Sequence, residues 1–152
     1  MDEVHIRLIR QKLVYLAERL EKLESFLVPS FEEYTKEPWR PAAVERMAQV
    51  VIDTIIGTNH ILLRACNKPP AASSWDSFRR VRELGIINPE LAKRFVKSYV
   101  GLRNRIVHLY EPLDDRRVFE TVQKLVKDAR GYLEEVAKFV ESEEQSAEGG
   151  ED

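Results

Sequence analysis

The chain has 152 residues, of which 43% are hydrophobic and 33% charged, so it suits one globular domain and is too apolar for a disordered chain. Its one cysteine, Cys66, excludes a disulfide framework and a zinc site of paired cysteines. No apolar run approaches the roughly 20 residues that span a bilayer, and charges interrupt the first turns, where a signal peptide needs an apolar core. A cytoplasmic protein with no membrane association is therefore expected.

The charge is unevenly distributed along the chain. The formal net charge is −2, but residues 141–152 hold six acids and no base, which leaves 24 bases against 20 acids in the rest. We expect a helical domain over residues 1–140 and a disordered acidic tail over 141–152. Bases gather within residues 88–110, a pattern that suits a polyanion such as RNA, although solvated surface bases would give it too.

Apolar residues recur at spacings of three and four in several long segments, which predicts amphipathic helices. Pro29 ends the first, a loop follows to Pro41, Ser74 can cap a short helix, and Asn88 with Pro89 can begin another. The long segments are residues 6–27, 42–64, 88–110 and 115–140. No segment alternates with a period of two, so an all-α antiparallel bundle of four main helices and one short helix is expected.

The segment "GLRNRIVHLY", residues 101–110, carries polar side chains inside an apolar run. On a helix of 3.6 residues per turn Arg103 lies in the middle of the apolar face and needs a partner or a wet cleft. Glu45 is a candidate partner, and a buried ion pair without a catalytic role would explain Arg103 equally well. Arg103 and His108 would point about 140° apart. They can converge if the helix ends or bends near His108, or if a two-fold dimer makes a composite site, which we favour.

The motif "RNRIVHLY" resembles the Arg-x4-His-x-Tyr signature of HEPN domains, specifically HepT-like toxins encoded beside small nucleotidyltransferase antitoxins. The similarity extends to residues 42–62 and 84–122 and covers most of residues 40–140. The resemblance implies a homodimeric, metal-independent endoribonuclease toxin. Arg103 and His108 would be catalytic and Asn104 would support them. Tyr110 would accept AMP from ATP through the antitoxin, which silences the nuclease.

These residue types suit RNA cleavage without a metal. An imidazole titrates near neutral pH and can act as general base or acid, so His108 fits that role. The planar guanidinium of Arg103 matches phosphate oxygens, and Asn104 can orient His108 or donate to the phosphate. Contacts to the RNA backbone would come from basic side chains before and beside the motif, namely Lys93, Arg94, Lys97 and Arg105.

No cofactor and no metal site are expected. The three histidines, His5, His60 and His108, lie in separate segments without a metal-binding spacing. Two other readings stay open: a non-catalytic accessory subunit that binds a nucleotide or a nucleotidyltransferase, and a plain bundle in which the polar motif only caps a helix.

Overall fold

A computed structural model describes residues 1–108 and 112–149, and within these ranges it contains helices and no strand. The elements are α1 (Glu3–Phe26), α2 (Phe31–Lys36), α3 (Trp39–Ala65), α4 (Ser74–Glu83), α5 (Pro89–Arg94), the π-helical segment η1 (Phe95–Tyr99), α6 (Val100–Val107) and α7 (Asp115–Gly149). The expected all-α fold is confirmed.

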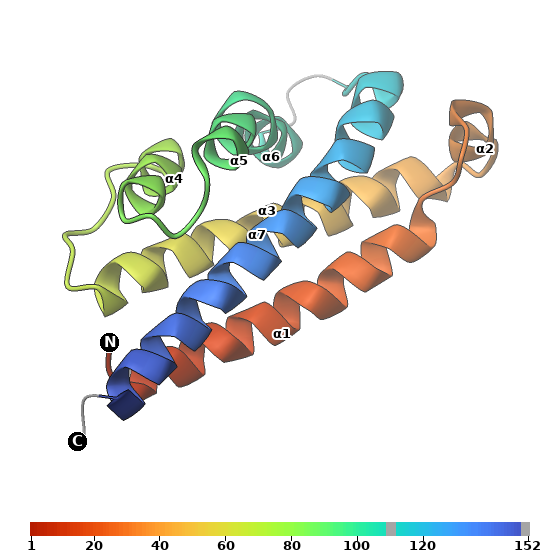
Figure 1. Ribbon diagram of the computed structural model, residues 1–152. Helices are drawn as coiled ribbons and strands as arrows, with labels where there is room; N and C mark the ends of the chain where they lie inside the picture. The colour runs from red at the N-terminus through yellow and green to blue at the C-terminus, as the bar shows by residue number, and fades with distance from the viewer. Residues whose placement is uncertain (109–111, 150–152) are drawn as a thin grey trace.

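Three long helices, α1, α3 and α7, form the body of the molecule, and α1 runs antiparallel to the other two (Figure 1). The shorter helices α4, α5 and α6 pack on the opposite side of α3 from α1 (Figure 1). The apolar stripes expected from the sequence face one another in the core. Fully buried members include Ile9, Leu16, Leu20, Leu23, Val51, Ile55, Leu62, Val122, Leu125 and Ala129.

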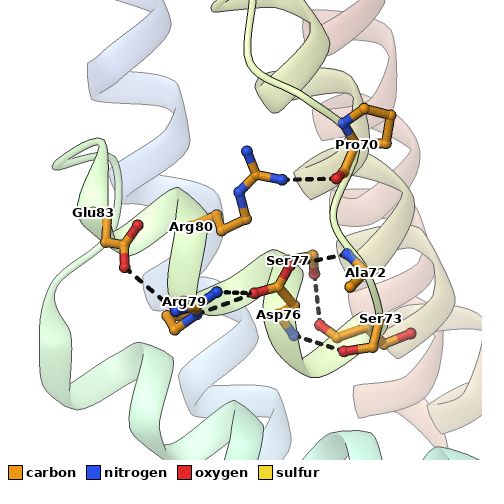
Figure 2. Close-up of polar contacts among 9 residues, drawn as sticks. Pro70, Ala72, Ser73, Asp76, Ser77, Arg79, Arg80 and Glu83 are labelled. Carbon is orange, nitrogen blue, oxygen red and sulfur yellow. Dashed lines mark hydrogen bonds and ion pairs between the residues drawn. The ribbon is translucent and has the colours of Figure 1, made fainter.

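Side-chain caps fix where the short helices begin. Ser73, one residue before the expected Ser74, caps α4 by accepting the Asp76 N–H at 3.0 Å. Figure 2 shows how the cap extends into the preceding loop, because Asp76 accepts the Ala72 N–H and Arg80 donates to the Pro70 carbonyl. The contact with Ser73 satisfies a donor that the first turn of a helix leaves unpaired, and the other two contacts hold the loop against α4.

The segment expected to be a loop between the first two long helices contains α2. Ser30 caps this helix by accepting the Glu33 N–H, and the Tyr34 ring is fully buried between the rings of Phe31 and Phe119. α3 begins at Trp39 and not at residue 42, because a proline such as Pro41 is tolerated in a first turn, where its missing N–H has no helical partner.

The expectation of a disordered tail after residue 140 is wrong for residues 141–149, since α7 continues to Gly149. Glutamate, glutamine and alanine are good helix formers, and Val140 is fully buried at the start of this stretch. The Arg10 guanidinium also donates to Glu144 at 2.5 Å, which ties the extension to α1. Over residues 1–108 and 112–149, no helix has the length and apolar character needed to cross a membrane.

Candidate active site

The motif lies at the end of a helical stretch that runs from Pro89 to Val107 through α5, η1 and α6. Asn88 caps its start by accepting the Leu91 N–H at 2.8 Å, and Pro89 occupies the first turn, as expected. The Asn88 side chain in turn donates to Glu135 of α7 at 2.7 Å. The beginning of the stretch is therefore anchored to the longest helix of the bundle.

A π-helical turn separates α5 from α6. In η1 the N–H of Val100 reaches the carbonyl of Phe95, five residues back, and such turns are frequent at functional sites. The Tyr99 hydroxyl and the Arg94 Nε–H both donate to Oδ2 of the buried Asp128 on α7, at 2.5 and 3.0 Å. Burial, followed by this hydrogen bond, raises the pKa of Tyr99, so the phenol stays protonated as a donor. The contacts of Tyr99 and Arg94 with Asp128 therefore hold the chain against α7 just before α6 begins.

Arg103 points from α6 toward α3 and forms an ion pair there with Asp53. Its Nε–H donates to Asp53 Oδ1 at 2.7 Å, and Nη1 donates to the Asn104 Oδ1 at 3.3 Å. The Arg103 side chain is 31% exposed and that of Asp53 39%, so the pair faces solvent. Two contacts thus orient a guanidinium whose remaining N–H groups can meet a phosphate.

The expected partner of Arg103 was Glu45, and this expectation is wrong. The carboxylate that reaches Arg103 belongs to Asp53, two turns further along α3. Glu45 instead lies near Asp115, and burial, followed by repulsion from Asp115, raises the pKa of Glu45. Projection on one helix identified the need for a partner, but only the packing of α6 on α3 determines which acid supplies it.

His108 follows α6 and has left the helical conformation, with φ −104° and ψ 54°. Its N–H donates to the carbonyl of Asn104 at 2.9 Å, which closes the last turn. The exposed imidazole lines a pocket of about 390 Å³ between α6 and the start of α7. Arg105 and Arg117 line the same pocket, together with Asp114, Thr121 and the apolar residues Leu102, Pro112, Leu113 and Val118. An imidazole beside two guanidinium groups suits a phosphate ligand.

The expected end of the helix near His108 is confirmed, but Arg103 is absent from the residues that line the His108 pocket. Asn104 contacts both residues, since its side chain accepts from the Arg103 guanidinium and its backbone carbonyl accepts the backbone N–H of His108. Within the described residues of one chain, Arg103 on α6 and His108 just after it therefore do not line a common pocket.

The other expected site residues have different surroundings. Tyr110 lies outside the described residues. Lys93, Lys97 and Arg105 are exposed, as backbone-contacting bases must be. Arg94 is half-exposed, but its guanidinium is paired with Asp128. It helps to hold η1 on α7, whatever further role it has toward RNA.

Two residues of the site were not predicted from the sequence. Asp53 is the only acid in the run "QVVIDTII", and an acid on an otherwise apolar helix face was the available signal. Arg117 lies in "DDRRV", where charge alone gave no reason to single it out. Over residues 1–108 and 112–149, no three His, Cys, Asp or Glu side chains are grouped as a metal site would need.

Solved structures share this arrangement of helices. The tri-AMPylated HEPN toxin of Shewanella oneidensis, in complex with its MNT antitoxin, superposes with a TM-score of 0.77 at 20% identity, over 91% of this chain and 99% of that chain. YutE of Bacillus subtilis, a cytosolic protein of unknown function, superposes with a TM-score of 0.75 at 14% identity, over 89% of this chain and 90% of the other. The helices of this chain therefore have the same fold as that HEPN toxin.

The family can be stated more narrowly. The family model described as "Ribonuclease HepT-like" matches residues 16–136, which is most of the chain. A curated relative, the tRNA nuclease HepT of Aphanizomenon flos-aquae (strain 2012/KM1/D3), is 24% identical over 140 residues, or 92% of this chain and 95% of the relative. The chain belongs to the family of HepT-like ribonucleases.

Proposed function

We propose that the chain is the toxin of a toxin–antitoxin pair and cleaves RNA without a metal, at a composite site formed by Arg103 and His108 of two copies. The observation that carries this proposal is the orientation of Arg103, whose guanidinium is held by Asp53 and Asn104 one turn before an exposed His108. The family is that of HepT-like ribonucleases, so RNA is the substrate class to expect.

The cleavage step needs only groups of this kind. A neutral His108 takes the proton of a ribose 2′-hydroxyl, and the 2′-oxygen attacks the adjacent phosphorus. The bond to the 5′-oxygen of the next nucleotide breaks, and a protonated imidazole gives that oxygen its proton. The products are a 2′,3′-cyclic phosphate and a free 5′-hydroxyl. Arg103 donates to the phosphate oxygens, where negative charge develops in the transition state.

A dimer explains how the two residues can meet. One chain presents Arg103 toward α3, whereas its His108 lines a pocket on the side of α7. Two copies related by a two-fold axis near α6 would bring both motifs to one cleft, with two imidazoles available as base and acid. Lys93, Lys97 and Arg105 would contact the RNA backbone on either side.

The partner in this proposal is a nucleotidyltransferase antitoxin. It would transfer AMP from ATP to the hydroxyl of Tyr110, with release of pyrophosphate. Because Tyr110 follows His108 by two residues, the attached nucleotide would obstruct the cleft, and its phosphate would compete with RNA for Arg103. The Shewanella oneidensis toxin is described as tri-AMPylated and bound to an MNT antitoxin, which supports this form of regulation.

Cleavage of total RNA in EDTA tests the proposal, with tRNA as the first purified substrate. We expect wild-type protein to leave cyclic-phosphate ends, and His108→Ala to lose roughly 10²- to 10⁴-fold in rate while still binding RNA. His5→Ala is the matched control, because that imidazole is bonded to Asp2 in the first turn of α1. If neither protein cuts and mass spectrometry finds Tyr110 unmodified, the chain is a binding subunit and not a nuclease.

Mixed dimers test the composite site. Arg103→Ala and His108→Ala proteins are each expected to cleave RNA far more slowly than the wild type, and refolding them together should restore part of the activity. Recovery requires that one copy supply the guanidinium and the other the imidazole. No recovery, with mixed dimers demonstrated by native mass spectrometry, would show that each copy carries a self-contained site or that cleavage needs the imidazoles of both copies.

A further inference from the structure

A second recess lies away from the motif, between α4 and the α5–η1 stretch. Its volume is about 480 Å³, and we call it the Trp75 groove. Its lining residues are Trp75, Asp76, Arg79, Arg82, Pro89, Glu90, Ala92, Lys93 and Val96. Trp75 is 42% exposed and Val96 36%, so the groove presents an aromatic ring and an aliphatic side chain to solvent.

The ring of Trp75 has no aromatic or cation–π partner among the described residues, in contrast to that of Trp39. The exposed ring of Trp39 meets the edge of Phe26 at 5.8 Å and is covered by the Arg40 guanidinium at 4.9 Å. A large indole exposed without such contacts is available for stacking with a planar ligand. The two tryptophans of the chain therefore differ in what their rings can accept.

The charge of the groove favours an anionic ligand. Arg79 is turned onto Asp76 and also reaches Glu83 (Figure 2). Its Nε donates to Asp76 Oδ1 at 3.0 Å and its Nη1 lies 4.0 Å from Glu83 Oε1, so the charge of Arg79 is already paired with acids. Arg82 and Lys93 form no ion pair within the described residues, and Glu90 is the remaining acid of the lining. The lining residues alone, three bases and two acids, thus carry a net charge of +1.

The groove also adjoins the base-rich stretch that leads to the motif. Lys93 belongs to both the groove and the expected RNA-contacting set, and Lys97 follows one turn later. From Val96 to Arg103 is roughly 10 Å along the helix axis at 1.5 Å per residue, a distance that a few nucleotides span. A strand crossing the motif can therefore continue into the groove.

We propose that the Trp75 groove binds an unpaired base of the RNA substrate, stacked on Trp75, with the adjacent phosphates on Arg82 and Lys93. An aromatic platform flanked by cations is how proteins bind single strands without needing base-specific contacts. The inference rests on the proposed ribonuclease function, and it adds a subsite that positions the strand away from the scissile bond.

Fluorescence tests the groove directly. In a Trp39→Phe background Trp75 is the only tryptophan, and a 2′-O-methylated single-stranded oligonucleotide cannot be cleaved, because it lacks the free 2′-hydroxyl. Binding should quench Trp75. Trp75→Ala should weaken the Kd of the oligonucleotide roughly 5- to 100-fold, the usual size of one base–aromatic stack, whereas Trp39→Phe should not change it.

Two charge-reversal variants provide a second measurement that leaves the Trp75 ring unaltered. Arg82→Glu should weaken oligonucleotide binding, whereas Lys22→Glu, an exposed base on α1 across the bundle, should change it much less. Absence of quenching, together with unchanged binding by Trp75→Ala, would overturn the proposal. So would a Trp75→Ala protein that binds RNA normally but no longer binds the nucleotidyltransferase, because the groove would then be a protein interface.

The composite site and the Trp75 groove can be refuted independently of each other. If His108→Ala does not impair cleavage but the oligonucleotide still quenches Trp75, the groove stands and the composite site is wrong. If His108→Ala abolishes cleavage and Trp75→Ala leaves both KM and Kd unchanged, the nuclease stands and the groove is wrong.

Discussion

Asp53 is the residue whose replacement tests the geometry of the site most directly. Its carboxylate accepts the Arg103 Nε–H at 2.7 Å, and both side chains are about one-third exposed. A hydrogen bond between charged groups is worth about 1.5–3 kcal/mol when shielded from water, and exposure reduces this to about 1 kcal/mol. We therefore expect Asp53→Ala to lower the kcat for RNA cleavage about tenfold, which corresponds to about 1.4 kcal/mol, and to change folding stability by less than about 1 kcal/mol.

The assay is steady-state cleavage of a fluorogenic RNA oligonucleotide, read as kcat and KM separately. Loss of orientation lowers kcat, whereas removal of a negative charge near the substrate would, by itself, lower KM. Arg103→Ala completes a double-mutant cycle, in which the two losses should not multiply, because Asp53 acts through Arg103. Glu45→Gln is the matched control, since it removes an acid from the same helix that does not reach Arg103.

Two outcomes would refute this reasoning. If Asp53→Ala lowers KM and leaves kcat unchanged, the carboxylate only neutralises charge and does not orient the guanidinium. If the losses from Asp53→Ala and Arg103→Ala multiply in the double variant, Asp53 acts on the reaction by a route that does not pass through Arg103.

Two further predictions concern stability. Burial, followed by repulsion from Asp115, raises the pKa of Glu45 above its unfolded value, so its contribution is present at low pH and is lost as pH rises through the folded pKa. Glu45→Gln should therefore raise the free energy of unfolding at pH 7 by up to about 1 kcal/mol, measured by urea titration. This gain in stability should shrink toward pH 4, and equal gains at pH 7 and pH 4 would contradict the prediction. Tyr132→Phe should cost about 1–3 kcal/mol in the same titrations, because the buried hydroxyl donates to Asn59 Oδ1 at 2.6 Å. Its control is Tyr34→Phe, since the buried Tyr34 hydroxyl has no hydrogen-bond partner among the described residues. Removal of that hydroxyl should be neutral or stabilising. Equal losses of stability in the two variants would show that the hydrogen bond of Tyr132 is not the cause.

The sequence was sufficient to predict the long helices and several helix ends. Apolar spacings of three and four identified α1, α3 and α7, because only an apolar face of that period can be buried between neighbouring helices. Asn88 and Pro89 marked the start of α5 through local contacts that need no tertiary partner. The signal for α2 was also present, as Ser30 followed three residues later by Glu33, but a six-residue helix depends on the burial of Tyr34 for its stability.

The motif likewise identified Arg103, Asn104 and His108 as candidates, and the chain belongs to the family of HepT-like ribonucleases. The sequence could not supply the partner of Arg103, because Asp53 is 50 residues away and reaches it only when α6 packs on α3. Projecting each segment on a uniform helix suggested Glu45 as the partner of Arg103. Such a projection does not show where the axes of α3 and α6 cross, so it could not identify Asp53.

The register of the motif helix was decided by tertiary contacts as well. The π turn at Phe95–Tyr99 adds a residue to one turn, and its anchor, Asp128, lies 29 residues beyond Tyr99. The continuation of α7 to Gly149 likewise includes a contact with Arg10, near the other end of the chain, which the local sequence could not indicate. Local periodicity determines which face of each helix is apolar, but the direction of an individual polar side chain depends on the neighbouring helix that packs against it.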